Sequence, residues 1–303
     1  MIGLTIKHLR YFDALARHGH FGRAAEACAI SQPALSLQIK DLESMLGAPL
    51  VERATRQIRM TTLGEEFLSR ARKILIEVDE LGALARTDEG PFKGLLRLGV
   101  IPTVAPYLLP AIIRELADRF PDLELQPREA VTKSLIEDLQ QSRLDLVIAA
   151  LPISEPTLRE FALFEEDFVL VRGVRDAGKP VPSPEKLQAM KLLLLEEGHC
   201  FRDQALSFCD IRPTDPRYLM GGSSLSTLVQ MVSAGLGVTL IPDMALPLET
   251  HSASVSVCRF PGEPPKRTIG MVWRKTNPLG NQLMQLGAVI RQIGQAQRDK
   301  IIE

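Results

Sequence analysis

The apolar residues of the 303-residue chain follow three different spacings. Short helical patterns separated by turns cover residues 1–60, one uninterrupted helical pattern covers 61–87, and strand-like and helix-like segments alternate over 90–303. Alternating strands and helices are typical of an α/β domain. The pattern therefore predicts a small helical module, a long helix and a larger α/β domain.

The first 60 residues have the pattern of a helix-turn-helix. Apolar residues at helical spacing predict one helix over 4–16, and a run of small residues predicts a second over 23–28. Ser31 is expected to be the N-cap of a third helix, whose apolar stripe extends to Leu46. Two short helices joined by a tight turn are typical of DNA-binding proteins, although a three-helix protein-interaction bundle has the same pattern.

The polar face of this third helix and the segment after it contain candidate DNA contacts. Residues 50–60 are expected to form a two-stranded wing whose arginines reach phosphates. Residues 1–60 carry eight Lys and Arg against five Asp and Glu, a net charge of +3, whereas the whole chain has a formal net charge of −1. This mildly basic module is compatible with a nucleic-acid partner. The residues expected to contact double-stranded DNA are Gln32, Pro33, Ser36, Gln38, Lys40, Arg53 and Arg56.

Residues 61–88 predict a long helix that begins after Thr61. Its apolar residues recur at alternating spacings of four and three over nearly three heptads, which favours a short coiled coil between two copies of the chain. A helix packed on its own domain is the alternative, because three heptads are few for a coiled coil. A dimer would place two recognition helices on neighbouring half-sites of DNA. The expected dimerisation residues are Phe67, Ala71, Ile74, Val78 and Leu81.

The region 89–303 predicts a two-lobed α/β domain. Its strand–helix units are expected to cross between lobes near residues 165 and 268, which gives a first lobe of about 89–164 and 269–303 and a second of about 165–268. This arrangement resembles a periplasmic binding protein with a site in the cleft. Because that scaffold holds many ligands, the fold alone does not assign a function.

Two cysteines in the expected second lobe suggest redox chemistry. Cys200 lies between His199 and Arg202, and a cationic neighbour or a helix start favours the reactive thiolate. The alternative is an inert cysteine beside a core histidine. If 200–209 are helical, the Cα atoms of Cys200 and Cys209 lie about 13 Å apart, whereas a disulfide needs them within about 7 Å. Joining them therefore requires local refolding, so that oxidation and a change of shape become one event.

Motifs along the whole chain resemble those of LysR-type transcription regulators. The N-terminal motifs are Phe21-Gly-Arg-Ala-Ala25, Ser31-Gln-Pro-Ala-Leu-Ser36, Gln38-Ile39, Leu42-Glu43, Leu46-Gly47, Arg53 and Thr61-x-x-Gly64. The chain departs from the family at Val51-Glu52, where a Phe usually precedes the wing arginine. The C-terminal motifs resemble the hydrogen-peroxide-sensing members of the family. They are Gly198-His-Cys-Phe-Arg-Asp-Gln-Ala205, Ile101-Pro-Thr-Val-Ala-Pro-Tyr-Leu-Leu-Pro110 and Arg267-Thr-Ile-Gly-Met-Val-Trp-Arg274.

The resemblance implies a winged helix-turn-helix domain over 1–60, a linker and dimerisation helix over 61–88, and a two-lobed, periplasmic-binding-protein-like regulatory domain over 89–303. It implies that the Cys200 thiolate attacks peroxide, that a sulfenic acid forms, and that Cys209 then condenses with it to a disulfide. The residues implied to bind peroxide are Thr103, His199 and Arg267, with Thr132, Asp203 and Gln204 further out. Cys28 and Cys258, the latter in a Pro-rich loop, are expected to be packing residues.

Composition narrows the classes of function. A hydrophobic content of 45% and a charged content of 24% are those of a folded globular protein. We expect a cytoplasmic protein without a membrane partner, because the chain has no secretory signal and no apolar run near the roughly 20 residues of a membrane helix. We expect that the protein is not an enzyme and binds no metal or cofactor, because the chain has no CxxC motif, metal-ligand cluster or phosphate loop.

The expected partners follow from the family resemblance. They are promoter DNA, RNA polymerase, other copies of the chain in a homodimer or homotetramer, and hydrogen peroxide as the signal for activating antioxidant genes. Three alternatives stay open: a LysR-type regulator that binds a small metabolite in the cleft, a thiol peroxidase with a DNA-binding domain, and a DNA-architectural protein. The last leaves the α/β domain of about 200 residues without a role.

Overall fold

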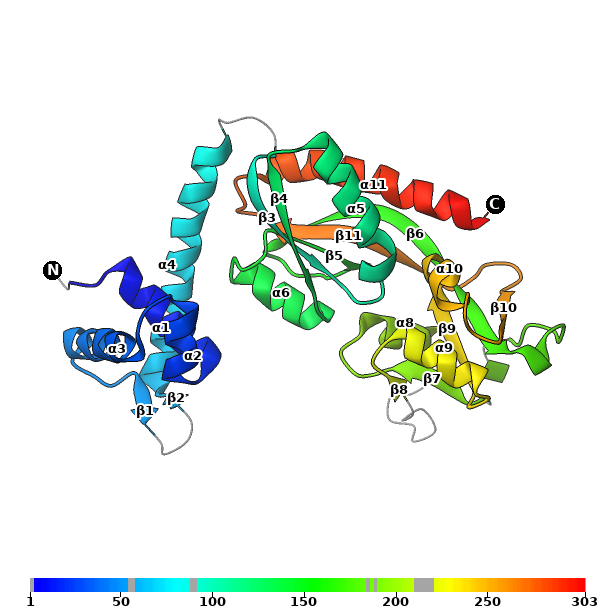
Figure 1. The fold of residues 1–303 in the computed structure, drawn as a ribbon, viewed down its shortest axis with the longest axis horizontal. Helices are drawn as coiled ribbons and strands as arrows, with labels where there is room; N and C mark the ends of the chain where they lie inside the picture. Colours follow the sequence, from blue (N-terminus) through cyan, green and yellow to red (C-terminus); the bar gives the residue numbers. More distant parts are fainter. Residues whose placement is uncertain are drawn as a thin grey trace. The chain divides into compact units, whose positions relative to one another are not determined.

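The computed structural model of the chain describes residues 3–53, 58–87, 92–183, 186–187, 190–209 and 221–302. The chain divides into two compact units, Met1–Ala85 and Arg86–Glu303 (Figure 1). The first is mainly helical and the second alternates strands and helices, so the expected α/β fold class is confirmed. The expected domain limits near residues 60 and 88, and the lobe limits near 164 and 268, remain predictions.

The first unit begins with three short helices, α1 (Ile6–His18), α2 (Phe21–Ala27) and α3 (Gln32–Leu46). The N-cap and the end of α3 are those predicted, since the Ser31 hydroxyl accepts a hydrogen bond from the Ala34 N–H at 3.3 Å and Gly47 adopts a left-handed φ of +70°. The helices share an apolar core whose members include Phe12, Leu15, Leu35, Ile39 and Leu42. This core fixes which face of α3 remains polar and exposed.

A two-stranded wing and a long helix follow. Strands β1 (Val51–Arg53) and β2 (Ile58–Met60) pair in antiparallel fashion, as expected. The Glu43 carboxylate of α3 accepts hydrogen bonds from the backbone N–H groups of Leu50 at 2.8 Å and Val51 at 3.2 Å, which ties the wing to α3. The Thr61 hydroxyl accepts from the Gly64 N–H at 2.9 Å and thereby caps α4 (Thr62–Thr87).

The expected dimerisation seam on α4 divides into two parts. The ring of Phe67 packs edge-on against Phe12, with 5.5 Å between centroids, and Ala71 is buried in the same unit. Ile74 and Leu81 are 45% and 66% exposed. Ala71 is covered by its own domain and Phe67 is half-buried, so the assignment of these two residues to a partner-facing seam stays a prediction.

The second unit contains one mixed sheet with the strand order β4-β3-β5-β11-β6-β9-β7-β8, and β10 pairs with β6. The strands are β3 (Gly94–Val100), β4 (Leu123–Glu129), β5 (Leu146–Leu151), β6 (Leu158–Gly173), β7 (Leu192–Leu195), β8 (Gly221–Gly222), β9 (Val238–Pro242), β10 (Val255–Arg259) and β11 (Lys266–Arg274). The helices are α5 (Ala105–Arg119), α6 (Thr132–Gln140), α8 (Cys200–Phe208), α9 (Leu225–Ser233), α10 (Leu246–Glu249) and α11 (Gly280–Ile302).

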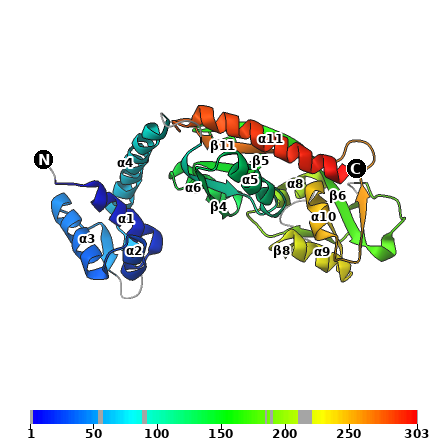
Figure 2. The ribbon, with the colours of Figure 1, turned by 45° about the horizontal axis from the view of Figure 1, so that its top comes forward.

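Two apolar clusters form the core of this unit. One comprises buried residues from 92–164 and 269–290 with Met244, and the other comprises buried residues from 168–245. The antiparallel pair β6 and β11 joins them, and α11 lies along β6 (Figure 2). Tyr107 of α5 packs against both clusters and donates a hydrogen bond to the Glu249 carboxylate at 2.7 Å.

Two strands bear on the sequence analysis. Strand β6 runs from Leu158 to Gly173, and the charged residues in its first half interrupt its apolar alternation. Cys258 lies on β10, opposite Leu170 of β6, rather than in a loop. Among the residues that the structure describes, no helix combines the length and apolar content needed to span a bilayer.

Candidate functional site

Three loops of the second unit converge on a small pocket around Cys200. The pocket is lined by Ile101, Pro102, Thr103, Val131, Thr132, His199 and Cys200. These residues follow β3, β4 and β7, at the ends of the strands from which α5, α6 and α8 begin. The carboxyl ends of parallel strands are the usual place for ligands in open α/β sheets, because several loops and helix starts meet there.

The starts of two helices contribute positive potential to this pocket. Helices α6 and α8, of nine residues each, begin at Thr132 and Cys200, and neither N-cap residue makes a side-chain capping bond. Gly198, with a φ of +95°, turns the chain immediately before α8. The first N–H groups of a helix and its dipole favour a negative charge, here the thiolate of Cys200. Cys200 is half-buried.

The two cationic neighbours expected from the sequence act differently. Burial lowers the pKa of His199 below its usual value, so the imidazole is neutral at pH 7 and supplies one N–H donor instead of a charge. Arg202 is buried and donates to the carbonyl oxygen of Leu195 at 2.9 Å, which attaches α8 to the end of β7. His199 therefore supplies no positive charge to the pocket, and the guanidinium of Arg202 is engaged at the end of β7.

A buried ion pair contacts one of the residues that line the pocket. Nε and Nη2 of Arg267 contact the Glu166 carboxylate at 2.7 and 2.6 Å, and both side chains are fully buried. Nη1 of Arg267 donates to Oγ1 of Thr103 at 2.8 Å, and Nη2 donates to the Thr103 carbonyl at 3.1 Å. The guanidinium also lies over the ring of Phe201, 5.2 Å from its centroid. Arg267 is thus an internal charge that holds Thr103 in place.

The ion pair affects both the Glu166 carboxyl group and the Thr103 hydroxyl. Burial raises the pKa of Glu166, and the adjacent charge of Arg267 opposes that shift. Because the Thr103 hydroxyl oxygen already accepts a hydrogen bond from Arg267, its own hydrogen is free to donate into the pocket that Thr103 lines. Thr103 does not cap α5, whose N-cap residue Val104 makes no side-chain capping bond.

The other predicted peroxide-binding residues are placed less centrally. Thr132 lines the pocket, and its buried hydroxyl oxygen has no hydrogen-bond partner among the described residues. Asp203 and Gln204 lie one turn along α8 and do not line the pocket; Asp203 is exposed, whereas Oε1 of Gln204 is buried without a partner in the described part of the chain. The free volume of the pocket is about 0 Å³, so its side chains must separate to admit even a water-sized molecule.

Cys209 is the capping residue at the far end of α8. Its side chain is buried, which raises the pKa of the thiol to about 11 and keeps it protonated at neutral pH. Cys200 and Cys209 are not joined by a disulfide in this conformation. A regular helix of this length separates their Cα atoms by about 13 Å, roughly twice the reach of a disulfide.

The expected DNA contacts lie mainly on α3. Gln32, Pro33 and Lys40 are exposed, and Ser36 and Gln38 are half-buried. Arg53 belongs to β1 through its backbone, and Arg56 lies outside the described residues. Sequence reasoning did not identify Glu166, the buried partner of Arg267. Its one signal, a carboxylate in a partly apolar strand, is shared by the exposed Glu165 and the half-buried Asp167 on either side of it.

Comparison with known proteins gives matches over nearly the whole chain. Residues 6–65 match the family model of the bacterial regulatory helix-turn-helix protein, lysR family, and residues 89–294 match the LysR substrate binding domain. The chain is 40% identical over 302 residues to the DNA-binding transcriptional dual regulator OxyR of Escherichia coli (strain K12), covering 99% of each chain. It is 42% identical over 292 residues to a probable hydrogen peroxide-inducible genes activator of Streptomyces viridosporus, covering 95% of this chain and 94% of the relative.

Solved structures give the same match. A full-length variant of OxyR from Pseudomonas aeruginosa superposes with a TM-score of 0.75 at 36% identity, over 95% of each chain. A cysteine variant of Corynebacterium glutamicum OxyR with bound H2O2 superposes with a TM-score of 0.68 at 34% identity, over 98% of this chain and 95% of the other.

Proposed function

Because the chain belongs to the LysR family of bacterial helix-turn-helix regulators, we propose that it is a transcription regulator that senses hydrogen peroxide through Cys200. Its relatives include hydrogen peroxide-inducible genes activators at about 40% identity. The observation that carries the proposal is the convergence of Thr103, Thr132, His199 and Cys200 on one pocket at the start of α8. The H2O2-bound state of a similar structure supports the choice of ligand.

The first chemical step is attack by the Cys200 thiolate on one oxygen of H2O2. The O–O bond breaks, the sulfur is oxidised to a sulfenic acid, and hydroxide leaves and takes up a proton to become water. The departing oxygen acquires negative charge, which hydrogen-bond donors aimed at it stabilise. The Thr103 hydroxyl, the N–H of neutral His199 and the helix N–H groups are the candidate donors, and Arg267 positions Thr103.

The second step is condensation of the Cys200 sulfenic acid with the Cys209 thiol, which forms a disulfide and releases water. Since α8 separates the two sulfurs too widely, the helix must unwind before the bond forms. Unwinding also exposes Cys209 and removes the burial that raises the pKa of its thiol. The resulting change of shape in the second unit is the signal, and each oxidation consumes one peroxide.

The output is transcription of target genes from promoter DNA in the cytoplasm. The exposed face of α3 and the wing contact the duplex. The part of α4 that carries the exposed Ile74 and Leu81 and the half-buried Val78 pairs two copies of the chain. Family membership supports a homodimer or homotetramer that acts on RNA polymerase.

The proposal is tested by counting thiols after one equivalent of H2O2 is added to the reduced full-length protein. We expect two thiols per chain to disappear and mass spectrometry to map a Cys200–Cys209 cross-link. Cys200→Ser should abolish both results and retain DNA binding, whereas the matched variant Cys258→Ser should behave as the parent. Retention of all four thiols, or a cross-link to Cys28 or Cys258, contradicts the proposal.

A further inference from the structure

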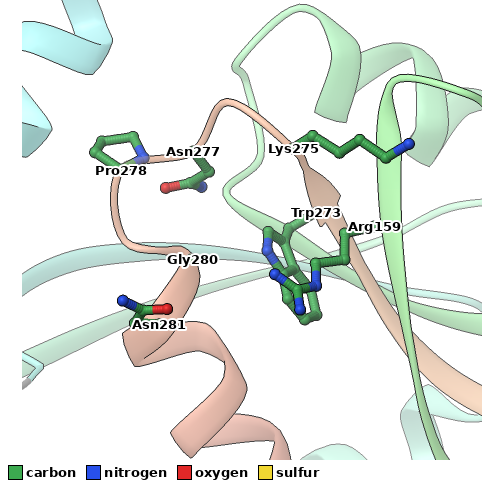
Figure 3. A pocket seen from close by; sticks show the side chains of 7 residues that line it. All are labelled: Arg159, Trp273, Lys275, Asn277, Pro278, Gly280 and Asn281. Carbon is green, nitrogen blue, oxygen red and sulfur yellow. The ribbon is translucent and has the colours of Figure 1, made fainter.

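A second, open pocket lies where β11 ends and α11 begins (Figure 3). Its volume is about 450 Å³, within the usual range for a small-molecule site. It is lined by Arg159, Trp273, Lys275, Asn277, Pro278, Gly280 and Asn281. None of these residues lines the Cys200 pocket, so the two sites are separate.

Strand pairing builds the floor of this pocket. Arg159 of β6 lies directly opposite Trp273 of β11 in the antiparallel register, so their side chains share one face of the sheet. The guanidinium lies 5.9 Å from the centre of the indole ring, and Trp273 is buried beneath it. Figure 3 shows the end of the Arg159 side chain over the indole of Trp273. The ring thus holds an exposed cation in a preferred orientation.

The charges around the pocket are of one sign. Arg159 and Lys275 are both exposed, no Asp or Glu lines the pocket, and neither cation pairs with a carboxylate in the described part of the chain. The Lys275 ammonium donates to the Pro156 carbonyl at 2.6 Å. In Figure 3 the Lys275 side chain points away from Asn277 and Asn281, so its ammonium group adds positive potential from the edge of the pocket.

The start of α11 adds donors to these cations. This helix is 23 residues long, and the Asn281 backbone N–H has no acceptor among the described residues. The Asn281 side chain is exposed at the same edge of the pocket. The Asn277 side chain is already engaged, because its oxygen accepts from the Leu279 N–H at 3.0 Å. The Arg159 guanidinium, the Asn281 amide and the start of α11 therefore line the same pocket, which no Asp or Glu lines.

We propose that this pocket binds a small organic oxyanion, a metabolite with a carboxylate or phosphate group. Arg159 forms the paired N–H···O contacts that such groups accept, and the start of α11 and Asn281 complete the coordination. This gives the regulator a second chemical input that is independent of the cysteines. Lys275 raises the affinity by its charge alone.

The single tryptophan of the chain, Trp273, reports on this site directly. We would titrate the reduced full-length protein with phosphate, citrate or chloride at constant pH and ionic strength and follow tryptophan fluorescence. We expect a saturable change with phosphate, citrate or both, and none with chloride. Saturation by phosphate alone identifies a phosphate group as the recognised part, and saturation by citrate alone identifies a carboxylate.

Variants distinguish specific binding in this pocket from nonspecific attraction of anions to positive charges on the protein. Because Arg159 touches the fluorophore, we would measure their affinities by calorimetry. Arg159→Ala should raise the Kd at least about tenfold, the effect expected for loss of a charge-assisted contact. Asn281→Leu should weaken binding too, whereas Arg114→Ala, which removes an exposed arginine from α5, should not.

Three results would overturn the proposal. One is an equal response to chloride, and another is an unchanged Kd in Arg159→Ala. The third is a response to duplex DNA of arbitrary sequence without any response to the small anions, which would identify the patch as a nucleic-acid contact.

Discussion

Arg267 donates from Nη1 to the hydroxyl oxygen of Thr103 at 2.8 Å, which joins β11 to the loop between β3 and α5. This bond occupies an acceptor position of the hydroxyl and leaves the Thr103 hydrogen available to the pocket beside Cys200. The Glu166 carboxylate anchors the guanidinium from the opposite side. The proposed donor to peroxide is therefore oriented by a buried charge that does not line the pocket.

Replacing Thr103 with Val should slow oxidation of Cys200 by about 100-fold, because one donor to a developing oxyanion contributes roughly that factor. The side chain keeps its shape and loses only the hydroxyl. The rate is measured as loss of thiol under excess peroxide. Thr250→Val is the control, since the Thr250 hydroxyl bonds to Leu246 of α10 and should leave the rate unchanged.

Replacing Glu166 with Gln should lower the free energy of unfolding by about 3 kcal/mol, because it leaves the charge of Arg267 buried without its counter-ion. Urea denaturation of the reduced protein measures this loss. The neighbouring Glu165 forms an exposed pair with Lys266 at 3.0 Å, so Glu165→Gln should have little effect. Equal free energies of unfolding for the two variants would show that the buried ion pair does not stabilise the fold.

The raised pKa of Cys209 predicts a specific dependence of stability on pH. The folded protein holds the thiol proton up to a pKa of about 11, whereas the unfolded chain loses it near the usual value of about 9. The contribution is thus complete below pH 9 and declines as the pH rises towards 11. The parent should lose about 2–3 kcal/mol more than Cys209→Ala between these limits, since one pKa unit corresponds to 1.36 kcal/mol. An equal loss of stability over this pH range in the parent and in Cys209→Ala would contradict the prediction.

Replacing Lys40 with Ala should weaken DNA binding and reduce its dependence on salt. Lys40 is exposed on α3, and each lost phosphate contact lowers the slope of log K against log salt by about 0.9. Binding isotherms at several salt concentrations measure the slope. Lys73→Ala removes the same charge from the exposed surface of α4 and should leave the slope as it is.

Replacing Ile74 with Glu should dissociate the proposed dimer, because it places a charge on an exposed apolar position of α4. Sedimentation of the reduced protein would show a smaller species at the same concentration. Leu248→Glu changes an exposed leucine of α10 and should leave the mass unaltered. Equal masses for both variants would exclude this part of α4 from the interface.

Much of the local structure could be predicted because its causes lie within a few residues. Ser31 and Gly47 mark the ends of α3, and Thr61 caps α4, since each acts on backbone groups at most four positions away. The start of α8 at Cys200 follows in the same way from Gly198. The resemblance of motifs then led to four of the residues that line the pocket, including Thr103 and Thr132.

The sequence by itself determined where α3 and α4 begin and which positions are apolar, because capping and periodicity act over short distances. Only the tertiary structure decided which apolar positions face the core: one repeat includes Ala71, which is buried, and Leu81, which is exposed. Likewise, Glu166 becomes the partner of Arg267 because β6 and β11 pair in one register. Residues about a hundred positions apart meet through the packing of the whole sheet, and no local pattern encodes that contact.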